Sequence, residues 1–124
     1  MTFLDTCVII DFLAGDEEIV ALVKELVKKE EIKTTAITEY ELLKHKTQIK
    51  KNAAEKFLSA VTVCSFDRAS ARKAALLFEK LSKAGKVINE NDLLIAGTAL
   101  SNNEVLFTRD QKFRNIDDAN IKIV

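Results

Sequence analysis

The sequence contains few of the residues that bind zinc, form disulfides or punctuate linkers. It has no proline, three glycines, two cysteines and one histidine. Cys7 and Cys64 are far apart and no secretion signal accompanies them, so we expect both thiols to be reduced. A single histidine and two cysteines do not supply the ligand set that a structural zinc site needs.

Hydrophobic runs of transmembrane length are also missing. No apolar run approaches the roughly 20 residues that a membrane helix needs, and residues 1–5 are typical of a first strand rather than a signal peptide. We therefore expect a cytoplasmic protein without a membrane span. The net charge is zero, from 19 basic and 19 acidic residues, which argues against a broad, non-specific nucleic-acid binder.

Hydrophobic patterning predicts strands that alternate with helices. Short apolar or β-branched runs favour strands at residues 2–5, 32–36, 61–64, 104–107 and 121–124. Helical spacing and capping residues favour helices at 7–13, 17–30, 38–46, 50–59, 67–84 and 92–101, with a single turn at 111–114. This alternation implies a parallel sheet covered by helices on both faces, which is an α/β fold. With 124 residues and no visible linker or repeat, we expect one domain over residues 1–124.

Four acidic residues lie where predicted strands end or predicted helices begin: Asp5, Glu41, Asp92 and Asp110. In α/β sheets the ligand crevice lies beyond the carboxyl ends of the strands, and Asp5 and Asp110 follow the first and fourth strands. Carboxylates that meet in a pocket raise one another's pKa or need a cation. Hard oxygen ligands favour Mg²⁺ or Mn²⁺, and such a site is typical of metal-assisted phosphodiester hydrolysis.

Each acid also has a purely structural interpretation. Asp5 and Asp110 can cap the helix or turn that follows them. Asp92 can be a first-turn acid that the helix dipole favours, although the helix after it is apolar nearly all round and therefore buried. Residues 38–41 match a capping box, in which Glu41 would reach back to the amide of the capping threonine.

Glu39 competes with Glu41 for a place in the acidic pocket. We expect Tyr40 and Leu43 to face the core together, which would leave Glu39 on a different side of the helix from Glu41. The two glutamates are about 200° apart on a helix with 100° per residue, so they cannot both serve the pocket.

The ordered set of motifs resembles the PIN-domain family, in particular the VapC-type toxins of toxin–antitoxin pairs. The matching stretches are residues 4–6, 37–42, 91–100 and 107–113, and the resemblance covers nearly the whole chain. It implies a three-layer α/β/α fold with a central parallel sheet of strand order 3-2-1-4-5. It also aligns Glu41 with the family's glutamate and implies that Thr6 and Thr108 lie in the site as hydroxyl partners.

The resemblance implies an endoribonuclease that hydrolyses RNA phosphodiester bonds. Asp5, Asp92 and Asp110 would bind one or two Mg²⁺ or Mn²⁺ ions, with Glu41 as a ligand or just behind the ligands. Arg109 and Lys112 adjoin Asp110 and are candidates for contact with RNA phosphates. A basic stretch beside the Glu41 helix is a further candidate, although we favour a solvated face as its explanation: Lys44, Lys46, Lys50 and Lys51.

The resemblance also implies an antitoxin partner and a homodimer. The antitoxin tail would lie over the acidic pocket, where an arginine or lysine could replace the charge of the metal. Val8, Ile9, Phe12, Leu13 and the helix at 17–30 could form part of the antitoxin groove, although we expect most of these side chains in the core. We interpret His45, the only histidine, as structural or solvated.

Two rival functions remain open. One is a stand-alone PIN nuclease of RNA processing without an antitoxin, which the gene neighbourhood would distinguish. The other is a non-catalytic PIN module that binds RNA or protein, which the presence of all four acids disfavours. The residue set of a phosphatase or a receiver-like domain is not evident.

Overall fold

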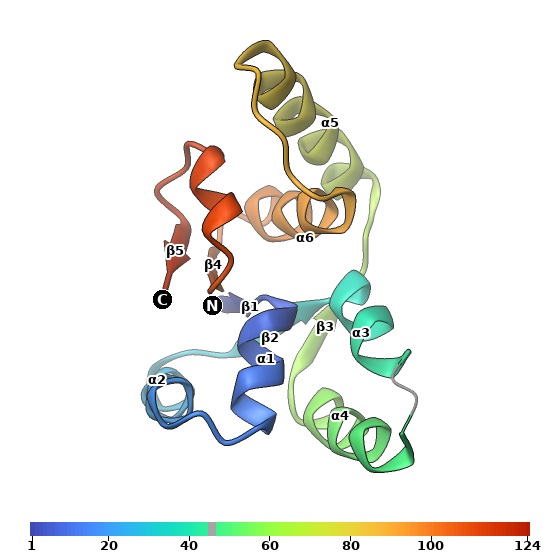
Figure 1. Ribbon diagram of the computed structural model, residues 1–124, viewed down its shortest axis with the longest axis vertical. Helices are drawn as coiled ribbons and strands as arrows, with labels where there is room; N and C mark the ends of the chain where they lie inside the picture. The colour runs from blue at the N-terminus through green and yellow to red at the C-terminus, as the bar shows by residue number, and fades with distance from the viewer. Residues whose placement is uncertain (45–46) are drawn as a thin grey trace.

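The chain forms a parallel β-sheet between two layers of helices (Figure 1). The structure is a computed structural model that describes residues 1–44 and 47–124. The strands are β1 (Thr2–Leu4), β2 (Ile32–Thr35), β3 (Thr62–Cys64), β4 (Val105–Thr108) and β5 (Ile121–Ile123). Their order is β3-β2-β1-β4-β5, and every neighbouring pair is parallel. The expected fold class and strand order are therefore confirmed.

Helices connect the strands and divide between the two faces of the sheet. They are α1 (Thr6–Leu13), α2 (Glu17–Lys29), α3 (Ala36–Leu43), α4 (Gln48–Ala60), α5 (Arg68–Lys83), α6 (Glu90–Ser101) and the 3-10 helix η1 (Gln111–Asn115). In Figure 1, α1, α2 and α4 lie below the sheet, whereas α5, α6 and η1 lie above it. No helix in the described part of the chain is both long enough and apolar enough to cross a membrane.

The central strand β1 contributes to both hydrophobic cores because successive side chains of a strand point to opposite faces. Phe3 is fully buried in the core beneath α5 and α6. Leu4 is fully buried in the core between the sheet and helices α1, α2 and α4. This two-sided burial leaves β1 without a solvent-exposed face, and it places the next residue, Asp5, at the buried carboxyl edge of the sheet.

Helix α6 is the most deeply buried helix among the described residues, as its apolar sequence predicts. Asn89 caps it by accepting a hydrogen bond from the amide of Asn91, so the helix begins two residues earlier than expected. Its Gly97 packs against α5, where an added Cβ would lie 2.8 Å from the Cβ of Ala74. Close packing of α6 on α5 therefore fixes the position of the first turn of α6, which carries Asp92.

The structure corrects the predicted start and register of α3. Thr35 at the end of β2 caps this helix by accepting a 3.0 Å hydrogen bond from the amide of Thr38, so the helix begins at Ala36. The prediction of a capping box that starts at Thr38 is therefore wrong, because Thr38 lies inside the helix. Tyr40 is 61% exposed, so the prediction that it faces the core is also wrong, and Leu42 occupies the core instead. His45 and Lys46 lie outside the described residues.

Candidate functional site

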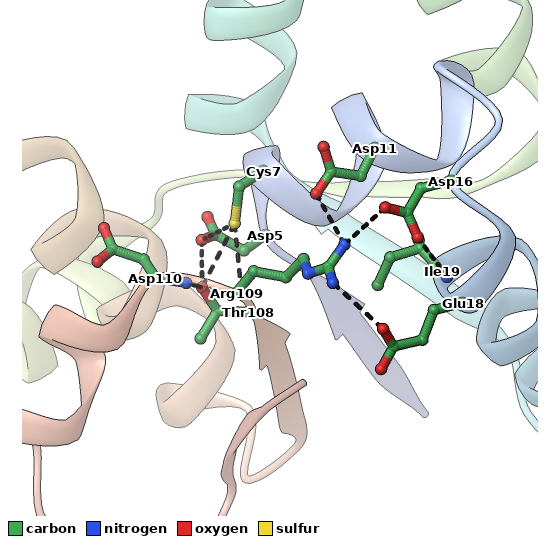
Figure 2. A network of polar contacts seen from close by, with 9 residues as sticks. All are labelled: Asp5, Cys7, Asp11, Asp16, Glu18, Ile19, Thr108, Arg109 and Asp110. Atoms are coloured by element: carbon green, nitrogen blue, oxygen red, sulfur yellow. Dashed lines mark hydrogen bonds and ion pairs between the residues drawn. The ribbon is translucent and has the colours of Figure 1, made fainter.

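The candidate site lies at the carboxyl edge of the sheet, where β1 and β4 run side by side. Asp5 follows β1 directly, and Asp110 follows β4 by two residues. Figure 2 shows both side chains together with Cys7 and Thr108 at this edge. Glu41 on α3 and Asp92 on α6 lie near the same edge. The charges of Asp5, Asp110 and Glu41 are close enough to raise the pKa of Asp92.

Asp5 is the most buried of the four acids, with 3% of its surface exposed. Its Oδ1 accepts a 2.8 Å hydrogen bond from the amide of Thr6, and its Oδ2 accepts a 2.7 Å bond from the hydroxyl of Thr108. Burial raises the pKa of Asp5 above its ordinary value, and the charge of Glu41 adds to this, although the hydrogen bonds oppose it. Asp5 therefore caps α1 and also brings a desolvated carboxylate to the site.

Glu41 is half-buried and is held by donors from two other elements. Its Oε1 accepts a 2.6 Å hydrogen bond from the hydroxyl of Thr6 on α1. Its Oε2 lies 3.5 Å from Nδ2 of Asn91 on α6. The Thr6 hydroxyl also lies 3.1 Å from that of Thr38, but its single proton serves the shorter contact to the carboxylate. These contacts place Glu41, and not its competitor Glu39, against the elements that carry Asp5 and Asp92.

Asp92 has a strongly raised pKa. Burial, followed by the charges of Asp5, Asp110 and Glu41, raises its pKa from 3.8 to about 7, and a hydrogen bond with Asp110 acts in the same direction. Its carboxyl group therefore stays partly protonated near neutral pH. A carboxyl group in this state indicates an excess of negative charge that a bound cation would relieve.

Asp110 and Thr108 connect η1 to the site. Asp110 caps η1 by accepting a 2.9 Å hydrogen bond from the amide of Lys112, as its structural interpretation predicts. Its own amide donates to the Thr108 hydroxyl at 3.1 Å, and that hydroxyl donates to Asp5. Thr108 thus orients Asp5 and fixes the start of the Asp110 turn with one buried group.

Cys7 and Asn91 also contact the acids, although the sequence patterns did not indicate either residue. The thiol of Cys7 donates to Oδ2 of Asp5 at 3.3 Å and lies 3.6 Å from the Thr108 hydroxyl. Burial and the charge of Asp5 raise the pKa of this thiol to about 11, so it stays protonated at neutral pH and is no nucleophile. The only sequence signal for either residue is its position, two residues after Asp5 or directly before Asp92.

Three of the basic residues predicted to contact RNA, Arg109, Lys112 and Lys44, have different surroundings. The guanidinium of Arg109 points away from Asp5 and Asp110 and pairs with acids of α1 and α2 (Figure 2). Lys112 is exposed on η1, two residues after Asp110. Lys44 is exposed at the end of α3, with its ammonium 5.2 Å from the ring centre of Tyr40. Contact of any of them with RNA stays a prediction.

The chemistry of the acidic site fits a hard divalent cation. All four acidic side chains offer carboxylate oxygens, which are the ligands that Mg²⁺ and Mn²⁺ prefer. Burial first, and the charges of neighbouring acids second, raise the pKa values of Asp5 and Asp92, and a bound cation would offset both effects. Within residues 1–44 and 47–124, no three His, Cys, Asp or Glu side chains already converge in ligand geometry. The ligand set of a metal therefore stays a prediction, which rests on charge and donor type.

Comparison with known proteins identifies the family. A family model described as PIN domain matches residues 2–119. Among solved structures, VapBC-1 from nontypeable Haemophilus influenzae is 29% identical, with a TM-score of 0.84 over 98% of this chain and 96% of that chain. VapBC-5 from Mycobacterium tuberculosis, described as a member of the VapBC family of toxin–antitoxin systems, is 28% identical, with a TM-score of 0.71 over 99% and 96% of the two chains.

A third solved structure supports the fold alone, because its sequence identity is lower. VapBC2 from Rickettsia felis, bound to a DNA fragment from its promoter, is 22% identical, with a TM-score of 0.87 over 99% of this chain and 98% of that chain. Comparison with curated protein sequences gave no match. The family match and the fold agree along nearly the whole length of the chain.

Proposed function

The chain belongs to the PIN domain family, and from this membership and its acidic site we propose that it is a metal-dependent ribonuclease, the toxin of a VapBC-type pair. The proposal treats residues 1–124 as one PIN domain and places the protein in the cytoplasm. One observation carries the nuclease part. The four acids are far apart in the sequence, yet the charges of Asp5, Glu41 and Asp110 all raise the pKa of Asp92, and the charge of Glu41 raises that of Asp5.

In this proposal Asp5, Asp92 and Asp110 hold Mg²⁺ or Mn²⁺, and Glu41 is a further ligand or orients the others. The bound ion would lower the pKa of a water molecule and neutralise charge on the scissile phosphate. Thr108 and the amide of Thr6 each orient one oxygen of Asp5, so its carboxylate cannot rotate freely. The Thr6 hydroxyl orients Glu41 in the same way.

Protonation of Asp92 makes the site sensitive to pH. With a pKa of about 7, this carboxyl group must lose its proton before it can serve as an anionic ligand. We therefore expect metal affinity to rise over roughly pH 6–8, about one unit on either side of this pKa. RNA phosphates would approach past the exposed Lys112 and Lys44, whose flexible ammonium groups can pair with a phosphate backbone.

An antitoxin is the partner that this proposal requires, and an apolar pocket between α1, α3 and α4 is a suitable place for it. The pocket is lined by residues of α1, α3 and α4: Ile10, Leu13, Ala14, Leu42, Ile49, Lys50, Ala53 and Ala54. Ile10, Leu13 and Ile49 are 41%, 38% and 82% exposed, so they are free to contact a partner. Val8 and Ile9 are fully buried and serve the core instead. One neighbour that shares this fold, VapBC-5, is described as a member of the VapBC family of toxin–antitoxin systems.

The proposal is tested by co-expression with the product of the adjacent gene, followed by RNA cleavage. We expect the two proteins to co-purify, and the separated chain to cleave structured RNA with Mg²⁺ or Mn²⁺ but not with chelator. Cleavage that persists in chelator would refute the metal mechanism. Cleavage without any co-purifying partner would favour the stand-alone nuclease of RNA processing. RNA binding without cleavage at any metal concentration would favour the non-catalytic module.

A further inference from the structure

We infer that Arg109 is a positioning residue, which clamps the turn between Thr108 and Asp110 to α1 and α2 and thereby holds two of the four site residues in place. The inference rests on the proposed function for its consequence in catalysis, but not for the clamp itself. It gives Arg109 a different role from the RNA contact that the sequence predicts.

The guanidinium of Arg109 binds three carboxylates from the α1–α2 corner. Its Nη1 lies 3.2 Å from Oδ2 of Asp11 and 3.1 Å from Oδ2 of Asp16, and its Nη2 lies 3.4 Å from Oε2 of Glu18. Only 28% of the Arg109 side chain is exposed, compared with 77% for Glu18. The planar fork of an arginine can serve several carboxylates at once, whereas the point charge of a lysine cannot do so in the same geometry.

The backbone of Arg109 makes a second contact with the same helix. Its amide donates to Sγ of Cys7 at 3.4 Å, and its side chain binds Asp11, which lies four residues later on α1. Residues four apart lie on the same face of a helix. Arg109 therefore holds one face of α1 with its amide and its side chain together, as Figure 2 shows.

Asp16 connects the Arg109 clamp to α2. Asp16 caps α2, because its Oδ1 accepts a 3.2 Å hydrogen bond from the amide of Ile19 while its Oδ2 binds Arg109. The cap bond and Arg109 together lower the pKa of Asp16 below its ordinary value. A single aspartate thus links the start of α2 to the turn beyond β4.

The residues on either side of Arg109 belong to the site. Thr108 orients Asp5, and Asp110 is one of the four acids. Thr108 is fixed by its strand, because its carbonyl accepts a 2.9 Å bond from the amide of Val124, but the chain leaves the sheet after it. The contacts of Arg109 hold this segment, residues 109–110, to α1 and α2. At its other end the segment continues into η1.

Three changes distinguish a clamp from a phosphate contact. Arg109→Gln removes the charge, Arg109→Lys keeps the charge without the fork, and Asp11→Asn with Asp16→Asn removes two partners while an asparagine can still cap α2. The matched control is Arg114→Gln, which removes one positive charge from an exposed side chain of η1. Circular dichroism melting shows first that each variant folds.

The first measurement is amide hydrogen exchange in the metal-free protein, which does not depend on any activity. We expect the amides of Arg109 and Asp110 to lose protection about 10-fold in Arg109→Gln and in the Asp11/Asp16 double variant, because local opening becomes easier. Arg109→Lys should not restore the protection, and Arg114→Gln should not change it. Unchanged protection in both Arg109→Gln and the Asp11/Asp16 double variant would overturn the inference, whether or not the protein cleaves RNA.

The second measurement combines Mn²⁺ titration calorimetry with steady-state RNA cleavage. A positioning role predicts Mn²⁺ affinity and kcat about 10-fold lower in both clamp variants, with KM nearly unchanged, as for other groups that orient metal ligands. A phosphate contact predicts that Arg109→Gln raises KM and that Arg109→Lys keeps KM near the wild-type value. It also predicts a lowered KM in the double variant. This pattern would overturn the inference. Lost protection in a protein that neither binds Mn²⁺ nor cleaves RNA would support the clamp and refute the proposed function.

Discussion

Asp92→Asn should make the metal-free protein more stable while it removes an acid from the site. The asparagine keeps the shape and polarity of the side chain but removes the negative charge that Asp5, Asp110 and Glu41 oppose. Asn at this position can also stay in the first turn of α6 without disturbing the cap, which Asn89 provides.

The magnitude follows from the pKa of Asp92, which rises from 3.8 to about 7. About three pKa units at 1.36 kcal/mol each would give an upper limit of roughly 4 kcal/mol. Asp92 is only half-buried, so solvent screening leaves about 1–2 kcal/mol of this limit. The lost attraction between the acid and the N-terminal helix dipole offsets about 0.3–1 kcal/mol. A net gain near 1 kcal/mol corresponds to a rise in Tm of roughly 3–6 °C for a domain of this size.

The sign of the effect fixes its pH dependence. Because the folded-state pKa lies above the unfolded value of 3.8, the penalty on the wild type is absent below that value and complete above about pH 7. The difference in Tm between the variant and the wild type should therefore be near zero at about pH 4, grow as the pH rises and level off above neutrality. Acids that do not interact with Asp92 contribute equally to both proteins and cancel in the difference.

The assay is thermal unfolding of both proteins in chelator and in Mn²⁺ across this pH range. Glu90→Gln is the matched control, since Glu90 is an exposed acid in the same first turn. It should leave Tm unchanged or lower it slightly, because it loses only the dipole interaction. Mn²⁺ should raise the Tm of the wild type more than that of Asp92→Asn, since a ligand of the folded state adds stability. A variant that melts below the wild type at every pH, with an equal response to Mn²⁺, would refute the reasoning.

Three further outcomes are expected from the structure. Glu41→Gln should reduce RNA cleavage about 100-fold, in the range for groups that act on a metal site. Glu39→Gln should change cleavage little. Equal losses in a cleavage assay would contradict the position of Glu41. Gly97→Ala should lower the free energy of unfolding by about 1–3 kcal/mol in denaturant titration, because its Cβ would lie 2.8 Å from that of Ala74; unchanged stability would mean that α5 moves away freely. Light scattering at micromolar concentration should show a homodimer, and a 13.9 kDa particle would refute that expectation.

Local sequence patterns were sufficient for the alternation of strands and helices and for the places where Asp5 and Asp110 would lie. Short apolar runs buried on both faces and well-spaced capping residues leave few alternatives to a parallel α/β sheet. The strand order, however, came from the family resemblance, because no local pattern states which strands are neighbours.

The prediction for α3 shows where local patterns are insufficient. Residues 38–41 match a capping box, but Thr35 caps the helix, and Tyr40 is exposed. The end of β2 decided where this helix starts, since pairing of Thr35 with Cys64 of β3 holds the last strand residue in the extended conformation that a cap requires. Glu41 was assigned to the site by resemblance, and its contacts with Thr6 and Asn91 provide the physical reason.

Only the tertiary structure could reveal the groups that hold the acids in place. Cys7 and Arg109 meet across 102 positions of sequence, and Arg109 turns toward Asp11 and Asp16 rather than toward its neighbour Asp110. A sequence shows which charges a chain carries and roughly where its elements begin. The direction of a long side chain depends on which opposite charges the folded chain brings within its reach, and that is decided by packing.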